Sequence, residues 1–446
     1  MPMTWMMRAA DQGGIPVALA EWERAGPASH PALRGLSFDG EPQARILAEE
    51  LTRSGRLKIV ERRDGITVDS TSLVGRLRLG PMALAISPKL EARRLSALLR
   101  WTYGLSDVRR VGDAEHSTEA FGFADLLAQQ LAQEAEVLLR RGLIRRYVER
   151  REELAVPRGR LDVPRLAARG GLVTAALPCR YFVRDANWPL NRLLRTGLER
   201  AATLAADHAL QRRLRALAAE MAAPMTDDVA PMRLDADAPR RAIERLDRQT
   251  AVYRPALTLI DLLLSGQGIT LDTPEGSLPL PGFLFDMNRF FERLLSRLLR
   301  KRLDGMELAD QHRLSGMFAY DAGSRRRRAP TPRPDFAVLK KGRVRLFADA
   351  KYRDLWAKGL PDDWLYQLSL YAMGTECRTA VILYPTVSAE AREERVVLRD
   401  PLRGGQLGAV VLRPLLIEEL ADRLAGAETR DTENWLSALA NRLLSV

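Results

Sequence analysis

The most constraining stretch of this chain spans residues 333–371, RPDFAVLKKGRVRLFADAKYRDLWAKGLPDDWLYQLSLY. Apolar residues over 336–338 and 344–350 flank a short turn, which predicts a β-hairpin. Because the turn is only a few residues long, the strands should pair and bring Asp335 close to Asp349. The two-residue period of a strand then puts Asp349 and Lys351 on one face. Two carboxylates and one ammonium are therefore expected to converge.

This combination of side chains fits metal-dependent hydrolysis of a phosphodiester. Carboxylates hold Mg²⁺, which neutralises charge in the transition state, so Asp335 and Asp349 are the predicted metal ligands. Lys351 is predicted to orient or polarise the attacking water and to stabilise developing charge. The sequence Asp349-Ala350-Lys351 is the only [DE]xK in a chain with seven lysines among 69 basic residues. The alternative is a surface hairpin with an ordinary ion pair.

Further residues extend the predicted site. Gln367 and Tyr371 are four apart and share one face of the following helix. There Gln367 would hydrogen-bond the catalytic strand or the scissile phosphate, and Tyr371 would pack or contact DNA; incidental polar residues on an amphipathic helix are the alternative. Glu292, on an amphipathic helix over 286–302, is a candidate third metal ligand or a solvated glutamate. A basic run would bind DNA phosphates from a loop, or would simply be solvated. The run comprises Arg325, Arg326, Arg327 and Arg328.

Composition narrows the class of protein. The net charge of +12 favours a polyanionic partner, in particular nucleic acid. Two cysteines without a CxxC pair and four histidines without metal-ligand spacing argue against a zinc site. No signal peptide and no apolar run of about 18 residues is present, so we expect a cytoplasmic protein away from membranes. None of the seven lysines precedes Ser or Thr, which excludes a P-loop and predicts that this chain binds no nucleotide.

Three regions are expected along the chain. Residues 1–119 form a β-rich domain with helices, because short alternating segments are broken by turns. Residues 120–270 form a mainly helical middle region with a short strand pair, and helical periodicity extends from 120 to 147. A linker rich in Gly and Pro over 265–282 then leads to a domain over 271–446. Its order of helix, strands, helix and strand predicts an α/β domain with a mixed central sheet.

The motifs RPDF, DAKY and YQLSLY resemble the PD-(D/E)xK nuclease superfamily with a trailing QxxxY helix. Upstream motifs narrow the resemblance to the McrC family, the nuclease subunits of McrBC-type modification-dependent restriction systems. In chain order these are LAISPK (84–89), LLRWTYGL (98–105), RGR (158–160), NWPLNRLLR (187–195) and FDMNRFFE (285–292). The resemblance covers about residues 15–425.

This resemblance implies a division of labour between two proteins. The region 1–119 would dock onto a hexameric McrB-like AAA+ GTPase and stimulate its GTP hydrolysis. The region 271–446 would be a PD-(D/E)xK restriction-endonuclease-like domain that uses Mg²⁺ to cut double-stranded DNA carrying modified bases. Asp335, Asp349 and Lys351 would be catalytic and Gln367 supporting. The alternatives are a stand-alone repair or phage-type exonuclease and a non-enzymatic GTPase-activating scaffold.

Overall fold

The computed structural model describes residues 14–105, 122–170, 175–225, 235–267, 270–273, 276–279, 282–300, 302–303, 305–321, 329–426 and 429–445. Contacts divide the chain into two compact units. The terminal unit combines residues 14–104 with residues 284–445, and the middle unit contains residues 122–283. The sequence patterns predicted three regions, with boundaries near residues 119 and 270. The two outer regions, however, fold together as one unit.

The N-terminal part of the terminal unit contains two small sheets. One has the strand order β1-β6-β5-β12, with β1 parallel to β6, and the other has the order β2-β4-β3. The elements are β1 (Ile15–Ala20), β2 (Arg24–Ala25), α2 (Pro42–Arg53), β3 (Lys58–Arg62), β4 (Gly65–Asp69), β5 (Leu73–Leu79), β6 (Met82–Ser87), α3 (Ala92–Tyr103) and, from beyond the middle unit, β12 (Gly282–Asp286). Proline at the first position of α2 fits a helix start, where the missing N–H needs no partner. The expected β-rich region is confirmed.

The C-terminal part of the terminal unit is built on a six-stranded mixed sheet with the order β13-β14-β15-β16-β18-β17. Strands β15, β16 and β18 are parallel, and the other neighbours are antiparallel. The elements are α10 (Met287–Arg300), β13 (Glu307–Asp310), β14 (Phe336–Lys340), β15 (Arg343–Ala350), α11 (Leu355–Lys358), α12 (Asp362–Met373), β16 (Thr379–Thr386), β17 (Glu394–Arg399), β18 (Gln406–Leu416), α13 (Ile417–Ala425) and α14 (Arg430–Leu444). The mixed central sheet is as expected.

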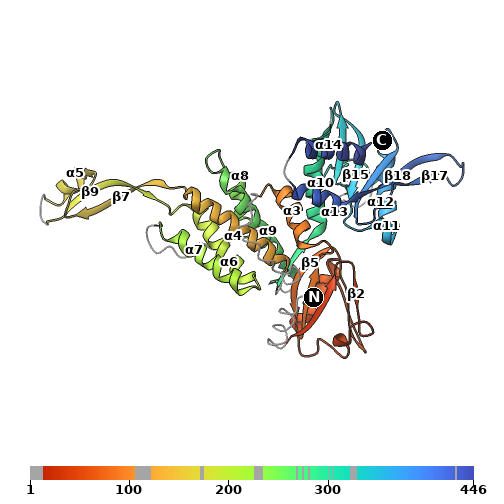
Figure 1. The fold of residues 1–446 in the computed structure, drawn as a ribbon, viewed down its shortest axis with the longest axis horizontal. Coiled ribbons are helices and arrows are strands. Elements are labelled where there is room, and N and C mark those ends of the chain that lie inside the picture. The colour runs from red at the N-terminus through yellow and green to blue at the C-terminus, as the bar shows by residue number, and fades with distance from the viewer. Residues whose placement is uncertain are drawn as a thin grey trace. The chain divides into compact units, whose positions relative to one another are not determined.

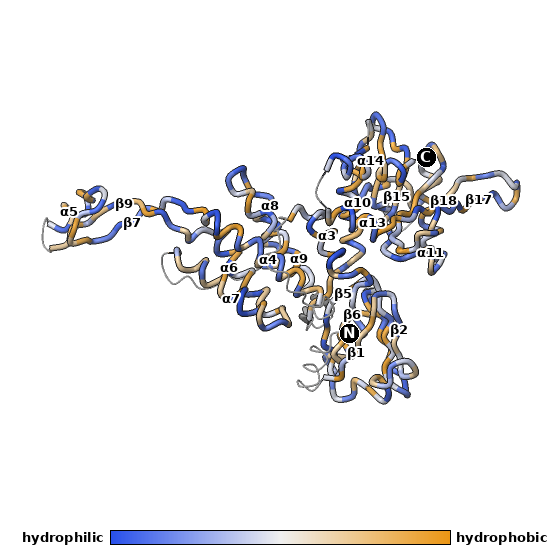
Figure 2. The backbone as a smooth tube through the Cα atoms, in the orientation of Figure 1, coloured by the Kyte–Doolittle hydropathy of each residue, from blue (hydrophilic) through white to orange (hydrophobic). Residues whose placement is uncertain are grey.

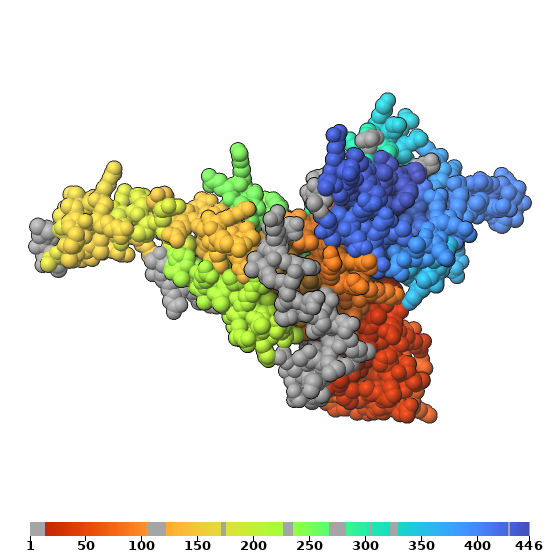
Figure 3. All heavy atoms as spheres, in the orientation of Figure 1, coloured from red at the N-terminus to blue at the C-terminus, as the bar shows by residue number. Residues whose placement is uncertain are grey.

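Helices cover this sheet and hold the functional strands in place. On α12, Leu368, Tyr371 and Ala372 are fully buried in a core that includes Phe347 of β15. Helix α10 presents a buried apolar stripe and contacts β15 and α14 (Figure 1). Every residue of β16 is buried, as expected for the centre of a covered sheet. In contrast, β17 and the start of β18, with which it pairs, project from the surface of this domain (Figure 1, and the blue protrusion in Figure 3).

Long-range contacts join the two parts of the terminal unit. Helix α3 packs against α13, which follows it by more than 300 residues. The Arg94 guanidinium forms ion pairs with Glu418 (2.7 Å) and Asp422 (3.0 Å) of α13. The apolar stripe of α3 is buried, so this helix requires a packing partner. The first and last regions of the sequence therefore form one unit.

The middle unit combines a helical group with a β-arm. Its elements are α4 (Phe123–Arg141), β7 (Arg146–Leu154), β8 (Arg160–Leu161), α5 (Val163–Ala168), β9 (Leu177–Asp185), α6 (Pro189–Leu204), α7 (His208–Ala222), α8 (Ala238–Glu244), α9 (Arg254–Gln267), β10 (Thr270–Thr273) and β11 (Gly276–Pro279). Strands β7 and β9 pair along nine residues and extend away from the helices of this unit, with α5 at the far end (Figure 1). Figure 2 shows that β7, with the sequence RYVERREEL, is mostly hydrophilic.

Two sequence expectations need correction in this unit. The helical pattern expected over 120–147 ends at Arg141, because Gly142 has a φ of 85°, and strand β7 begins at Arg146. The segment 265–282, expected as a linker, contains the end of α9 and the β10–β11 hairpin. Among the described residues, no helix is both long and apolar enough to span a membrane.

Candidate active site

The β14–β15 hairpin forms the centre of the candidate site. Its register pairs Phe336 with Ala348, which sets Asp335 opposite Asp349. The Asp335 N–H donates to Oδ1 of Asp349 (3.1 Å), and the Ala350 N–H donates to Oδ2 of Asp335 (2.9 Å). Each carboxylate is thus held by the backbone of the other strand. The structure brings the two acids together, as the hairpin pattern predicted.

Lys351 completes this group. Its Nζ lies 2.9 Å from Oδ2 of Asp349, and the side chains of the pair are 19% and 2% exposed, respectively. Burial opposes a charged lysine, but the adjacent Asp349 carboxylate outweighs it and raises the Lys351 pKa. The ammonium also lies over the Trp364 ring of α12, 5.4 Å from its centroid. Lys351 is therefore a fixed cation beside the acid pair.

The electrostatics show that negative charge is crowded here. Burial and then the Asp349 charge raise the pKa of Asp335 to about 7. Burial and then the Asp335 charge raise the pKa of Glu292, on α10, to about 8. The structure thus places Glu292 within electrostatic range of the pair. Acids with raised pKa values hold protons near neutral pH unless a cation compensates their charge.

The donor set fits a magnesium ion held by few protein ligands. Among the described residues, no group of three or more His, Cys, Asp or Glu side chains is arranged to hold a metal ion. Glu292 therefore stays a prediction as a third ligand. Mg²⁺, however, is commonly bound through one or two carboxylates together with water and substrate phosphate. Asp335 and Asp349 supply such a pair, and a divalent cation would relieve the repulsion between them.

The helix α12 supports the site from one side. Gln367 donates from Nε2 to the Tyr371 hydroxyl (2.8 Å), so the two predicted residues do share one helical face. Tyr371 is only 1% exposed and packs edge-on against Phe347 of β15. Its burial favours the packing alternative over contact with DNA. The run Arg325–Arg328 lies outside the described residues.

Sequence reasoning missed two residues that contact the predicted set. Gln311 donates from Nε2 to Oδ1 of Asp335 (3.1 Å). It follows β13, a strand that the sequence did not predict, and its φ is 50°. Trp364 lies in the first turn of α12 beneath Lys351. Its position three residues before Gln367 on a predicted helix was a usable signal, whereas nothing in the sequence marked Gln311.

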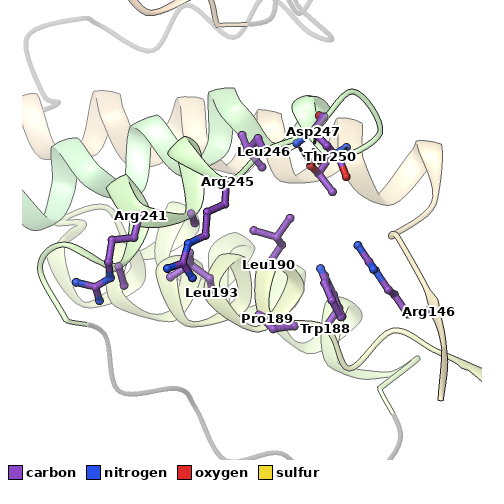
Figure 4. Close-up of a pocket in the computed structure, with 12 residues that line it drawn as sticks. Arg146, Trp188, Pro189, Leu190, Leu193, Arg241, Arg245, Leu246, Asp247 and Thr250 are labelled. Carbon is purple, nitrogen blue, oxygen red and sulfur yellow. Dashed lines mark hydrogen bonds between the residues drawn. The ribbon is translucent and has the colours of Figure 1, made fainter. Parts of the chain in front are cut away.

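A cavity in the middle unit differs in chemistry from the candidate active site. It measures about 340 Å³, and its wall includes Trp188, Leu190 and Leu193 together with arginines (Figure 4). The Arg146 guanidinium lies 3.9 Å from the centroid of the Trp188 ring. Asp247 is the only carboxylate among its described lining residues, and it accepts hydrogen bonds from Thr250. The described lining of this cavity therefore offers no pair of acids for a metal ion.

Comparisons with known proteins agree with this fold. A solved half-complex from a tetradecameric assembly of Thermococcus gammatolerans McrB AAA+ hexamers with bound McrC contains a chain similar to this one, with a TM-score of 0.61 and 18% identity over 96% of this chain and 100% of that chain. A second structure, the Thermococcus gammatolerans McrBC complex, matches with a TM-score of 0.44 and 17% identity over 64% of this chain and 87% of that chain. No curated protein matches this chain significantly.

A family model gives the assignment. The model described as McrBC 5-methylcytosine restriction system component matches residues 68–385. This match covers well over half of the chain, including the β14–β15 hairpin and α12. The expected relationship to McrBC-type systems is thereby confirmed. This chain belongs to the family of McrBC 5-methylcytosine restriction system components.

Proposed function

We propose that this chain is the Mg²⁺-dependent DNA endonuclease subunit of a two-component, GTP-driven restriction complex that acts on modified DNA. The observation that carries this proposal is the meeting of Asp335, Asp349 and Lys351 at the end of one hairpin, in a chain of the McrBC family. The mixed sheet beneath the hairpin and the helix α12 beside it support a PD-(D/E)xK nuclease domain. The net charge of +12 favours DNA as the substrate.

The residues of the site have distinct roles in this proposal. Asp335 and Asp349 hold Mg²⁺, which when bound neutralises charge on the scissile phosphate. Lys351, held by Asp349, donates a hydrogen bond that orients the attacking water and adds positive charge beside the phosphate. Gln311 fixes one oxygen of Asp335, so the carboxylate keeps its orientation. Gln367 and the buried Tyr371 support β15 from α12.

We further propose that an McrB-like AAA+ GTPase activates this subunit in the cytoplasm. No lysine in this chain precedes Ser or Thr, so a P-loop motor must come from another polypeptide. The fold resembles a chain in an assembly described as McrB AAA+ hexamers with bound McrC, which supports such a partnership. The N-terminal residues 1–119 are the proposed region for docking and for stimulating GTP hydrolysis.

The test is cleavage of methylated and unmethylated DNA with the GTPase partner, GTP and Mg²⁺. Asp349→Ala and Lys351→Ala should each reduce cleavage by at least about a hundredfold. Both variants should still stimulate GTP hydrolysis, because neither residue lies in residues 1–119, the predicted docking region. Lys340→Ala, which removes an exposed lysine from the end of β14, is the matched control and should cut normally.

Three outcomes would contradict the proposal. Intact cleavage by either site variant would exclude this hairpin as the active site. End-dependent degradation by the purified chain without GTP would favour a stand-alone exonuclease. Stimulation of the GTPase without DNA cleavage under any metal condition would favour a non-enzymatic scaffold.

A further inference from the structure

A strained corner at the end of β1 contacts the residue that follows Lys351. Trp22 adopts a φ of 59°, in the left-handed region that bulky side chains rarely occupy. The corner is fixed by hydrogen bonds from the Trp22 N–H to the Thr71 carbonyl oxygen (3.2 Å) and from the Ser70 hydroxyl to the Ala20 carbonyl oxygen (2.7 Å). The surrounding structure thus holds Trp22 in an unfavourable conformation, as is common where a residue has a functional task.

Two adjacent side chains of this corner hold Tyr352 at both ends. The Tyr352 hydroxyl donates to Oε1 of Glu21 (3.1 Å), and Nε1 of Trp22 donates to the Tyr352 carbonyl oxygen (3.0 Å). Tyr352 is 6% exposed, and its ring packs against Phe291 of α10. Lys358 adds a hydrogen bond from Nζ to the Trp22 carbonyl oxygen (2.7 Å). These bonds connect segments that lie some 330 residues apart.

Tyr352 is bonded directly to Lys351, so its position restricts the backbone from which the Lys351 side chain extends towards Asp349. The Lys351 N–H donates to the Leu383 carbonyl oxygen of β16 (2.9 Å), and the Lys351 carbonyl oxygen accepts from the Arg353 N–H (2.8 Å). The bonds from Glu21 and Trp22 therefore act on the middle residue of this tight turn. A second set of contacts connects Trp22 to Lys351 through the Arg353 guanidinium and the Trp364 ring. The Arg353 guanidinium lies 5.8 Å from the Trp22 ring centroid and 5.9 Å from that of Trp364, the ring beneath Lys351. Both sets of contacts begin at the corner.

The burial of the Glu21 carboxyl in this corner is energetically unfavourable. The residue is 1% exposed, and burial raises its pKa to about 7. Its Oε1 accepts hydrogen bonds from Tyr352 and from the Lys89 N–H (2.6 Å), whereas Oε2 has no hydrogen-bond partner among the described residues. Glu21 also lines a cavity of about 260 Å³ together with Trp22 and Tyr352. A buried carboxyl with an unpaired oxygen is destabilising, so packing alone does not account for it.

We propose that Glu21 and Trp22 are positioning residues of the nuclease site, which hold Tyr352 and thereby set the Lys351 ammonium against Asp349. The proposal rests on the proposed nuclease function. It also implies that the position of the β1-β6-β5-β12 sheet affects the geometry of the active site. A displacement of this sheet relative to β15 changes the Lys351–Asp349 pair without any contact between that sheet and DNA.

Substitutions at two of these positions separate the hydrogen bond from packing. Tyr352→Phe removes only the hydroxyl, and Glu21→Ala removes the acceptor. Glu21→Gln keeps an oxygen for Tyr352 and Lys89 and puts its amide where Oε2 has no partner, so it is the conservative rescue. Tyr384→Phe is the matched control, because Tyr384 is fully buried and its hydroxyl has no hydrogen-bond partner among the described residues.

The first measurement needs no nuclease activity. Brief reductive methylation of the full chain, followed by mass spectrometry, reports how accessible each lysine is. Lys351 should react several-fold faster in Tyr352→Phe and in Glu21→Ala than in the wild type, and at the wild-type rate in Glu21→Gln and in the Tyr384→Phe control. The exposed Lys340 serves as the reference within each sample. Unchanged labelling of Lys351 in Tyr352→Phe would overturn the proposal.

The second measurement is cleavage by the complex with its GTPase partner. Tyr352→Phe and Glu21→Ala should lower kcat about tenfold, the effect of one lost hydrogen bond of about 1.4 kcal/mol, with KM for DNA unchanged. Glu21→Gln should restore kcat. Faster labelling with an unchanged kcat would overturn the positioning role. If the wild type does not cut DNA, the proposed nuclease function fails, and the labelling alone then decides whether the corner positions Lys351. If Glu21→Ala does not fold, Tyr352→Phe decides both measurements.

Discussion

Replacing Asp335 by asparagine should make the metal-free protein more stable while abolishing cleavage. Burial, and then the charge of the neighbouring Asp349, raise the pKa of Asp335 from 3.8 to about 7. An acid with a raised pKa binds its proton more tightly in the folded state than in the unfolded state. Stability is therefore lost as pH rises from about 4 towards about 7, and the loss is complete above that range. Asparagine is uncharged and escapes this loss.

The size of the effect follows from the shift. About three pKa units at about 1.4 kcal/mol each give a ceiling of roughly 4 kcal/mol above pH 7. The two carboxylate oxygens accept one hydrogen bond each, from Ala350 and from Gln311. Asparagine has one side-chain oxygen and so keeps one of these bonds, and the loss of the other costs about 1 kcal/mol. The net gain is roughly 3 kcal/mol, or about 6–12 °C in Tm for a unit of this size.

Thermal unfolding in EDTA, from about pH 5.5 to about pH 8, measures this directly. The Tm advantage of Asp335→Asn should grow across that range and then level off. Adding Mg²⁺ at about pH 8 should raise the Tm of the wild type but not that of the variant, because ligand binding stabilises the folded state. Asp64→Asn, in the exposed β3–β4 turn, is the charge-matched control and should change little. A variant no more stable than the wild type at the higher pH would refute this account of the site.

Three further predictions follow from the same geometry. Lys351→Arg should lose at least about a hundredfold in cleavage by the complex, since a planar guanidinium cannot replace a compact ammonium beside Asp349; wild-type rates would contradict the assigned role. Cleavage at low Mg²⁺ should rise with pH through about 7 to 8, because Asp335 and Glu292 lose their protons in that range. A higher Mg²⁺ concentration should move this rise to lower pH. A rise that stays at the same pH would count against metal binding by these acids. Gly65→Ala should lower the free energy of unfolding of the terminal unit by about 3 kcal/mol, measured by thermal unfolding. Gly65 has a φ of 137°, and an added Cβ would lie 2.1 Å from the Leu33 carbonyl oxygen. Gly404→Ala is the control and should cost less, because Gly404 has a φ of 72° and open space around it.

The hairpin shows how far local sequence information reaches. A short turn between two apolar runs determines that two strands pair, and the pairing determines which residues are opposite one another. Asp335, Asp349 and Lys351 were therefore found from spacing alone. The four-residue interval likewise put Gln367 beside Tyr371, although only the packed structure showed that Tyr371 is buried.

Local patterns misplaced two boundaries in the middle of the chain. Apolar periodicity continued past Arg141, but a positive φ at Gly142 ended α4 and let β7 start at Arg146. The Gly- and Pro-rich stretch over 265–282 resembled a linker, yet it contains the β10–β11 hairpin. In both places turn residues lie between regular elements, and composition does not distinguish a short turn from a longer loop.

By itself, the sequence determined the acid pair with its lysine, the lack of a P-loop lysine and the resemblance to the McrC family. Only the tertiary structure decided that residues 14–104 fold with residues 284–445, that Gln311 contacts Asp335, and that Glu21 and Trp22 hold Tyr352. The physical reason is the range of the forces involved. Strand period, turn length and helix spacing act over a few residues, whereas a contact between positions 21 and 352 depends on how whole sheets and helices bury their apolar faces.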